Sequence, residues 1–417
     1  MAAATSLNRR QLLLPALGLA VSGTAYGGHA ATRKAPATAA VPLRQFGARG
    51  DGVSDDTAAL KHALATGRPL DGGGQVYGVR GDLNAGRSFR GLSNCTLRQL
   101  APTLRVRTLT IDGASDFRLA NVAFQRGRAD DEAGVLRDLI ENAALWITGC
   151  SGFVLDHVTV SGGGFGTGVM ISESHGFQVV DLTVRDVVYR RHQRPTNDVF
   201  QGLWINRGRD FDLIRPVVRN LGGQDDQGFT HDNNRAIAIG GSSNFRVRDI
   251  DLSDCGQGLD VTGTEGNRNF QVTGGVVRDC WTFGFKFANS ASGGAISGGR
   301  AERCGLAGFV VSGPTEGVDP PSQDITFSDC TAIDCGRPNQ PGTMFGFGVM
   351  RALPVDYPRR IRFVRCTAID RRTPAGMKWG FFNEIHPPQG QANTIEGCTV
   401  SGAALKPTFG FPKAGRL

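Results

Sequence analysis

One phrase of apolar residues recurs along most of the chain and constrains its fold more than any other feature. A large apolar residue is followed by another at +2 and by apolar or small residues at +5 and +7. The copy at Phe245 continues with Val247, Ile250 and Leu252, and the shortest separations between copies are 24 or 25 residues. The copies begin at Phe117, Phe153, Phe177, Phe211, Phe245, Phe270, Gly294, Ile325, Ile361 and Asn393.

A third apolar segment follows in each copy. It begins near a small residue, as in Gly202-Leu203-Trp204-Ile205 and Gly258-Leu259-Asp260-Val261. Three short alternating segments in a repeat of this length describe one coil of a β-solenoid, whose stacked coils share a continuous core. The leucine-asparagine consensus of leucine-rich repeats is missing. The sequence therefore predicts an all-β chain, a right-handed parallel β-helix of about ten or more coils.

Composition agrees with many turns and an acidic partner. The chain has 59 glycines among 417 residues without a Gly-X-Y period, which excludes collagen. A hydrophobic content of 40% excludes a disordered chain. The formal charge of +8 suits an acidic partner, but no lysine-rich run or nucleic-acid motif accompanies it, so we expect no nucleic acid to bind.

Two further columns of the repeat are assigned to structure rather than to catalysis. An Asp or Asn recurs at +9, where we expect it to bond turn backbone. Cysteines recur at +10 and +5, where adjacent coils stack them as buried and mostly free thiols. The +9 residues are Asp186, Asn220, Asp254, Asp279, Asp334 and Asp370; the cysteines are Cys255, Cys280, Cys304, Cys335, Cys330, Cys366 and Cys398.

The first thirty residues have the pattern of an export signal. Arg9-Arg10 precedes an apolar stretch to about Val21 and then small residues, and this stretch is too short to span a bilayer stably. The paired arginines resemble a twin-arginine signal; an ordinary secretory signal or a retained anchor are the alternatives. We expect a signal peptide at 1–30, a linker at 31–40, and a periplasmic or secreted mature protein without a transmembrane segment.

The segment from Phe46 to Thr57 predicts how the solenoid begins. Gly50 and Gly52 permit a tight turn, and Ser54 can cap a helix that runs to about Leu64. Asp55 and Asp56 would occupy the first turn of this helix. Its apolar residues would cover the open end of the solenoid, where strand edges invite aggregation. These are Ala59, Leu60, Ala63 and Leu64.

The stretch Phe46-Gly47-Ala48-Arg49-Gly50-Asp51-Gly52-Val53-Ser54-Asp55-Asp56-Thr57 resembles the N-terminal motif of the pectate-lyase-like β-helix family. That family includes bacterial and phage polysaccharide-degrading enzymes. The resemblance implies one domain over 41–417, with an N-terminal cap at 41–80, and a polysaccharide as its partner; the positive charge indicates that this polysaccharide is acidic. It names no substrate. Many family members trimerise, so the protein is expected to be a monomer or a homotrimer.

Insertions gather on one edge of the predicted solenoid. The longest connections separate the second and third segments, at 126–142, 186–200, 220–234, 334–345 and 370–379, and would form a wall beside the third-strand sheet. Trp146 and Trp204 fall on its outward positions, where their flat faces would suit sugar rings unless the long loops bury them. The outward middle column is Trp146, Met170, Trp204, Ala238, Asp260 and Lys286; the preceding column is Ala143, Thr167, Gln201, Arg235, Gln257 and Phe283.

The third-strand register resembles that of polygalacturonases but lacks their catalytic residues. Phe200-Gln201 stands where their Asn-Thr-Asp would end, Gly256-Gln257-Gly258 replaces Gly-His-Gly, and Phe285-Lys286-Phe287 replaces Arg-Ile-Lys. Asn234-Arg235 stands in place of their paired aspartates. Because glycoside hydrolysis needs two carboxyl groups across the bond, that machinery is absent. Leu155-Asp156-His157 resembles a pectate-lyase strand but falls at a corner, so we assign it to structure.

The remaining polar residues suit uronate β-elimination by a polysaccharide lyase. Arg235 could neutralise the sugar carboxylate, Lys286 or His231 could remove the C5 proton, and Asp260 could orient Lys286. The sequence specifies no cofactor, although loop carboxylates could bind Ca²⁺ through hard oxygen ligands. The candidate Ca²⁺ ligands are Asp225, Asp226 and Asp232; the candidate substrate-binding residues are Trp146, Trp204, Gln201, Gln257 and Asn234.

Three other functions stay open at this point. A glycoside hydrolase could use Asp225 or Asp226 with Asp260. A C5-epimerase would share the proton abstraction. The chain could also be a non-catalytic glycan-binding or structural solenoid.

Overall fold

The structure is a computed structural model whose compact unit runs over Thr38–Leu417. It describes residues 39–100, 107–126, 143–162, 166–190, 201–224, 234–263, 265–313, 321–339, 342–351, 357–384, 391–402 and 406–411. The expected signal peptide and the loop candidates Asp225, Asp226, His231 and Asp232 lie outside the described residues. In the described part of the chain, no helix is both long and apolar enough to cross a membrane.

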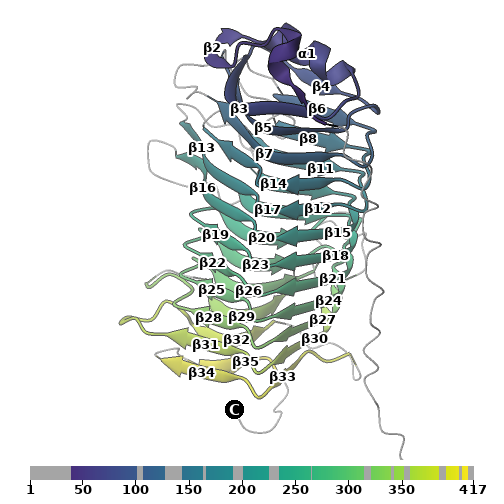
Figure 1. Cartoon of the computed structure of the whole chain (residues 1–417). Coiled ribbons are helices and arrows are strands. Elements are labelled where there is room, and N and C mark those ends of the chain that lie inside the picture. Colours follow the sequence, from purple (N-terminus) through teal and green to yellow (C-terminus); the bar gives the residue numbers. More distant parts are fainter. Residues whose placement is uncertain are drawn as a thin grey trace, which may run out of the picture. The chain divides into compact units, whose positions relative to one another are not determined.

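The chain winds into stacked coils of three parallel strands each, as the repeat predicts. One coil comprises β15 (Arg209–Ile214), β16 (Val217–Gln224) and β17 (Arg235–Gly240); the next comprises β18 (Ser243–Arg248), β19 (Asp251–Ser253) and β20 (Gln257–Val261). Equivalent strands of the two coils pair in parallel, with Phe211 beside Phe245, Val218 beside Leu252 and Ile237 beside Leu259. Figure 1 shows the resulting stack of strands. The expected right-handed β-helix register is therefore present residue by residue.

The other strands repeat the same three positions. The first strands are β9 (Val154–Asp156), β12 (Gln178–Val180), β21 (Arg268–Thr273), β24 (Ser292–Ser297), β27 (Gln323–Ser328), β30 (Arg359–Val364) and β33 (Thr394–Glu396). The second strands are β10 (Thr159–Ser161), β13 (Thr183–Arg190), β22 (Val276–Arg278), β25 (Arg300–Glu302), β28 (Thr331–Ile333), β31 (Thr367–Asp370) and β34 (Thr399–Gly402). The third strands are β4 (Leu83–Ala85), β6 (Leu109–Asp112), β8 (Ala143–Thr148), β11 (Thr167–Ser172), β14 (Gln201–Asn206), β23 (Phe283–Phe287), β26 (Ala307–Ser312), β29 (Phe345–Met350), β32 (Trp379–Asn383) and β35 (Lys406–Phe409).

The third strands form a sheet of their own. Within the described residues it is 12-stranded, whereas the first and second strands join one 23-stranded sheet through long N-terminal strands that bend across a corner. These strands are β3 (Leu70–Val79), β5 (Gly91–Gln99) and β7 (Arg118–Arg126), preceded by β1 (Val41–Pro42), the 3-10 helix η1 (Leu43–Phe46) and β2 (Asp51–Asp55). The third-strand sheet therefore offers one continuous outer face.

Stacked phenylalanine rings fill one column of the core. From Phe117 to Phe270, successive ring centroids are 4.8–5.3 Å apart and interplanar angles are 10° or less. This spacing matches the distance between paired strands, so each coil adds one ring. The column leaves the first strand at Gly294, where a Cβ would lie 2.3 Å from the Phe270 ring. Phe287, from a third strand, stacks on Phe270 in its place at 5.6 Å.

The corner residues explain the Asp/Asn column at +9. Asp186, Asn220, Asp254 and Asp279 have φ between 54° and 57°, the left-handed region that Asp and Asn tolerate better than most residues. Asn220 Nδ2 donates to Asp186 Oδ1 across coils at 2.9 Å. The column is structural, as expected. The expected bonds to turn backbone are present at Asp334 and Asp370, which accept from the N–H groups of Arg371 and Met377.

The cysteines confirm the expectation of buried free thiols. All nine are free and buried. Burial raises the pKa of the Cys95 thiol to about 12 and raises that of Cys255 further, so neither is a ready nucleophile.

The N-terminal cap differs from expectation at Ser54. The helix α1 (Thr57–Ala65) buries Leu60, Ala63 and Leu64 as predicted and lies at the N-terminal end of the stack (Figure 1). Ser54 is too far from its first turn to cap it; the Ser54 hydroxyl donates instead to Asp51 Oδ2 at 2.7 Å. The prediction of a Ser54 cap is therefore wrong, because the local turn uses that hydroxyl first.

We expect Phe211→Ala to lower the free energy of unfolding by about 3–5 kcal/mol, because it removes a fully buried ring with a neighbour on each side. Denaturant unfolding would measure this loss. The control Val53→Ala removes methyl groups that are 74% exposed and should change stability by less than about 0.5 kcal/mol. Equal losses in the two variants would contradict the ring column as a stabilising feature.

Asp51 should titrate well below other aspartates. Its carboxylate accepts hydrogen bonds from the Ser54 hydroxyl and from the Ser54 and Val53 N–H groups, which lower its pKa from 3.8 to about 2. These bonds stabilise the fold above the unfolded pKa and are lost as pH falls through about 2. Carboxyl ¹³C NMR should report this pKa and a higher one in Ser54→Ala. An unchanged Asp51 pKa in Ser54→Ala would contradict the role of the hydroxyl.

Candidate active site on the outer face of the third-strand sheet

The pairing of the third strands brings the predicted outward residues into line. Trp146, Met170 and Trp204 are paired positions of β8, β11 and β14. Ala238 pairs with Trp204 and with Asp260, and Asp260 pairs with Lys286. The alignment of this column on one face is confirmed.

A buried carboxylate joins two cations near the middle of this face. Asp260 is fully buried, and its Oδ2 lies 2.7 Å from Arg235 Nε and 3.6 Å from Lys286 Nζ. The side chains of Arg235 and Lys286 remain 23% and 19% exposed. Lys286 Nζ also donates to Gln257 Oε1 at 3.4 Å. Because a carboxylate is costly to bury alone, Asp260 fixes both cations while the cluster keeps one net positive charge.

The contact between Arg235 and Asp260 is short but poorly aligned. Neither Arg235 Nε nor the Asp260 oxygens make a hydrogen bond of acceptable geometry with the described atoms. The buried Gln201 Oε1, on the strand paired with that of Arg235, also lacks a donor there. Unsatisfied polar atoms are rare in protein cores and concentrate where function requires them.

Three predicted substrate-binding residues lie beneath the surface. Gln201 and Gln257 are 2% and 4% exposed, and Asn234 is completely buried. In this conformation they support the strand ends instead of facing solvent. Sequence alternation places Gln201 and Gln257 on the outer side of the sheet but does not report how deeply the neighbouring residues cover them.

A depression of about 300 Å³ opens beside Arg235. Its walls include Trp204, Arg235, Ala238, Arg207 and Glu265. Trp204 is half-buried. Arg207 Nε lies 2.9 and 3.0 Å from the two Glu265 oxygens, and these bonds hold the pKa of Glu265 below its ordinary value. This volume is at the lower end of the range of small-molecule sites.

Trp146 is less available than Trp204. The guanidinium of Arg107 lies 3.4 Å from the centroid of the Trp146 ring, and the indole N–H donates to Ser172 Oγ at 3.1 Å. One ring face is therefore covered. The repeat could not predict this contact, because Arg107 precedes a third strand and is not part of the apolar phrase.

The sequence also missed the ion pair of Arg207 and Glu265 at the rim. Both residues lie in the connections that follow third strands, outside the strand positions used for the prediction. The signal that could have found them is their opposite charge at equivalent places in nearby coils.

A second group of polar residues has metal-ligand types at a different corner. His157 Nδ1 lies 2.7 Å from Asp156 Oδ1, and His157 Nε2 lies 3.7 Å from Asp181 Oδ2. Arg118 pairs with Asp156, and Arg215 pairs with Asp181 at 2.8 Å and lowers the pKa of Asp181. Since arginines already neutralise both carboxylates, this group is a corner ion-pair network, consistent with the structural assignment of Asp156 and His157.

Comparison with known proteins agrees with the architecture. Residues 225–352 match a family model described as "Right handed beta helix region". The chain is a right-handed parallel β-helix. No curated protein matches it.

Several solved structures are similar to this β-helix. The A-module of an Azotobacter vinelandii mannuronan C-5 epimerase has 14% identity and a TM-score of 0.43, covering 89% of this chain and 98% of its own. A family 28 exopolygalacturonase from Yersinia enterocolitica has 11% identity and a TM-score of 0.48, covering 89% and 79%. An endo-xylogalacturonan hydrolase from Aspergillus tubingensis has 11% identity and a TM-score of 0.49, covering 87% and 93%.

We expect Asp260→Asn to lower the free energy of unfolding by about 3–5 kcal/mol, because it leaves two partly buried cations without their shared carboxylate. Denaturant unfolding at neutral pH would measure the loss. Asp329 provides a matched control, because its ion pair with Arg365 is 53% and 62% exposed. Asp329→Asn should cost less than about 1 kcal/mol. A similar loss in both variants would contradict the special role of Asp260.

Proposed function

We propose that this β-helix is an exported enzyme that processes an acidic polysaccharide, and that it cleaves a uronate-containing glycan by β-elimination. One observation carries the proposal. On the outer face of the third-strand sheet, two partly exposed cations, Arg235 and Lys286, share the fully buried carboxylate of Asp260. The site is therefore positive toward solvent and rigid at its base. The expected signal peptide supports export.

The first requirement is recognition of a sugar carboxylate. The cluster of Arg235, Lys286 and Asp260 carries one net positive charge, so it favours an anionic ligand. Arg235 offers a planar guanidinium that Asp260 holds in place through Nε, and such a guanidinium is suited to a bidentate bond with a carboxylate. Trp204 and the depression beside Arg235 would receive the adjoining sugar ring.

The second requirement is removal of the C5 proton. A protein cation beside the uronate carboxylate makes the C5 proton more acidic. It also stabilises the negative charge that develops as this proton leaves. A base accepts the proton, the C5–H electron pair forms the C4–C5 double bond, and the C4–O bond breaks. The leaving oxygen then takes a proton. Lys286 is our candidate base once it has given its own proton to solvent, while Arg235 remains the cation that neutralises the uronate carboxylate. His231, outside the described residues, is the alternative.

The buried state of Asp260 argues against a hydrolase that uses it. A glycosidase acid or nucleophile must reach the glycosidic bond, whereas the Asp260 side chain has no exposed surface. Two cations also occupy its surroundings. Asp260 therefore fits the role of a positioning residue for Arg235 and Lys286.

The activity can be tested on alginate, pectate, glycosaminoglycans and bacterial exopolysaccharides. We expect one of them to yield an unsaturated uronate, detected by its ultraviolet absorbance. Lys286→Met should lower kcat by about 100-fold or more, because it removes the proposed base while leaving Asp260 paired with Arg235. Arg365→Gln removes a corner cation far along the chain from this site and should leave kcat unchanged.

Other products would reject the elimination. New reducing ends without unsaturation would indicate hydrolysis, and inversion at C5 without cleavage would indicate epimerisation. Binding of a glycan without any turnover would assign a non-catalytic role. Full activity in a folded Lys286→Met protein would exclude Lys286 as the base.

A further inference from the structure

A larger depression, of about 610 Å³, lies along the corner between the second and third strands. Asn220, Asp254, Trp281, Arg303, Arg337 and Arg372 are among its walls. These residues come from successive coils, so the depression extends along the stack. None of its lining residues lines the depression beside Arg235. We refer to it as the corner depression.

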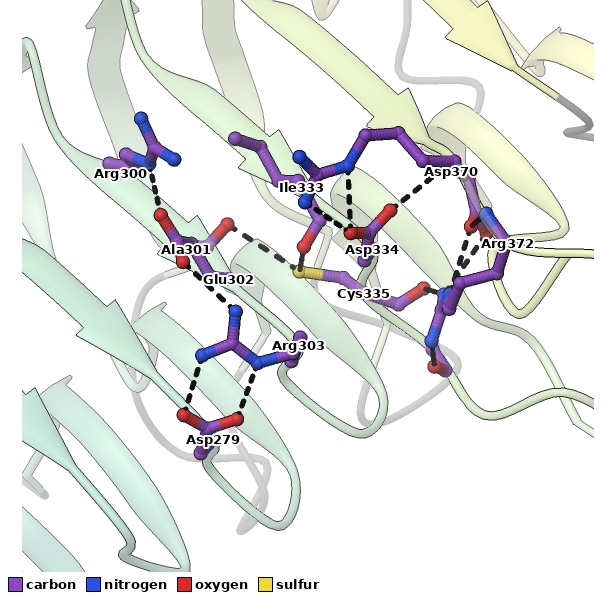
Figure 2. Close-up of polar contacts among 12 residues, drawn as sticks. Asp279, Arg300, Ala301, Glu302, Arg303, Ile333, Asp334, Cys335, Asp370 and Arg372 are labelled. Atoms are coloured by element: carbon purple, nitrogen blue, oxygen red, sulfur yellow. Dashed lines mark hydrogen bonds and ion pairs between the residues drawn. The ribbon is translucent and has the colours of Figure 1, made fainter.

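Most arginines near this corner are neutralised by aspartates. Arg303 bonds Asp279 with two contacts of 2.7 Å, and Arg372 bonds Asp370 at 2.9 Å (Figure 2). The pair with Asp279 raises the pKa of Arg303. The Arg303–Asp279 pair links neighbouring coils, whereas the Arg372–Asp370 pair lies within one turn. Both pairs leave little charge for a ligand.

Arg337 is held differently. Its guanidinium carbon lies 3.7 Å from the centroid of the Trp281 ring, and Nη2 donates to the Trp281 carbonyl at 2.5 Å. Among the described residues no carboxylate forms an ion pair with Arg337, and burial lowers its pKa. The wall of the corner depression therefore contains a guanidinium that lies on an aromatic ring and has no ion-pair partner among the described residues.

The fold provides space for this arrangement at Gly305. A Cβ at Gly305 would lie 2.8 Å from Arg337 Nη2 and 2.9 Å from its Nε. The missing side chain lets Arg337 reach across one coil to the indole of another. Stacking orients the guanidinium plane, and a planar oriented guanidinium is suited to a carboxylate or another planar anion.

We infer that Arg337 and Trp281 form a second glycan-binding subsite, which takes an acidic saccharide with its carboxylate on Arg337 and its ring in the corner depression. Asp254 fits a saccharide ligand, because its exposed carboxylate, which forms no ion pair with the described residues, can accept hydrogen bonds from sugar hydroxyl groups. The subsite does not depend on the chemistry proposed for Lys286.

The test uses the full chain with fluorine-labelled tryptophan, with the Trp281 signal assigned through Trp281→Phe. Galacturonate and mannuronate tetramers should shift this signal saturably in the wild-type protein. Arg337→Gln should weaken the response at least 10-fold, which corresponds to about 1.4 kcal/mol. Arg337→Lys keeps the charge without the planar fork and should give an intermediate loss. Arg371→Gln is the matched control, because Arg371 is 63% exposed and paired with Asp334 outside the depression.

Several outcomes would decide against the subsite. No Trp281 shift, or an equal shift in a folded Arg337→Gln protein, would overturn it. An equal response to a neutral galactose tetramer would remove the role of the carboxylate, and an equal response to sulfate alone would reduce the site to a simple anion site. Lys286→Met should keep the Trp281 response even if it abolishes turnover; loss of the response in that variant would place the binding on the sheet face instead.

Discussion

Stacking of equivalent residues at the spacing of paired strands is the constraint on which the rest of the structure depends. Each coil places a given side chain about 4.8 Å from its counterpart in the next. Inside, this spacing equals the separation of stacked rings, and the phenylalanine column follows it from Phe117 to Phe270. Outside, the same spacing would bring like charges together. At Asp260 the equivalent residue of the next coil is Lys286, so opposite charges lie side by side there.

The two depressions differ in how each makes a cation available to an anionic ligand. On the third-strand face, the buried carboxylate of Asp260 is shared by two cations, Arg235 and Lys286, so the cluster has one more cation than carboxylate. At the corner, Arg303 and Arg372 are each matched by an aspartate, whereas the guanidinium of Arg337 lies on the Trp281 ring without an ion pair among the described residues. Both arrangements hold a cation rigidly, which reduces the ordering cost of binding an anion.

Periodicity made the fold and the alignment of the site predictable. The positions of Phe245, Asp260 and Lys286 within their coils follow from the spacing of apolar residues alone, because a parallel solenoid repeats one register. The depth of a side chain does not follow from it. Gln201 and Gln257 occupy outward positions yet are buried. Trp146 is covered by Arg107, which lies outside the phrase.

Contacts between non-equivalent positions were also beyond the sequence. Ser54 satisfied Asp51 instead of the helix, because the nearer partner formed a complete turn. Arg337 reaches Trp281 only because the intervening coil has glycine at position 305. A repeat predicts which residues are equivalent, whereas these contacts depend on where the repeat is broken.

At Gly294 the column of stacked rings moves from the first strands to the third strands, and this change divides the solenoid into two sections. Before it, each coil presents the same ring to both neighbours, so a coil could be duplicated or deleted as a unit and the junction would still fit. At Phe270 and Phe287 the ring passes from a first to a third strand, and no other coil can substitute there. Length variation among descendants of this chain should therefore avoid that junction, since the third-strand rings from Phe285 to Phe381 stack regularly beyond it as well.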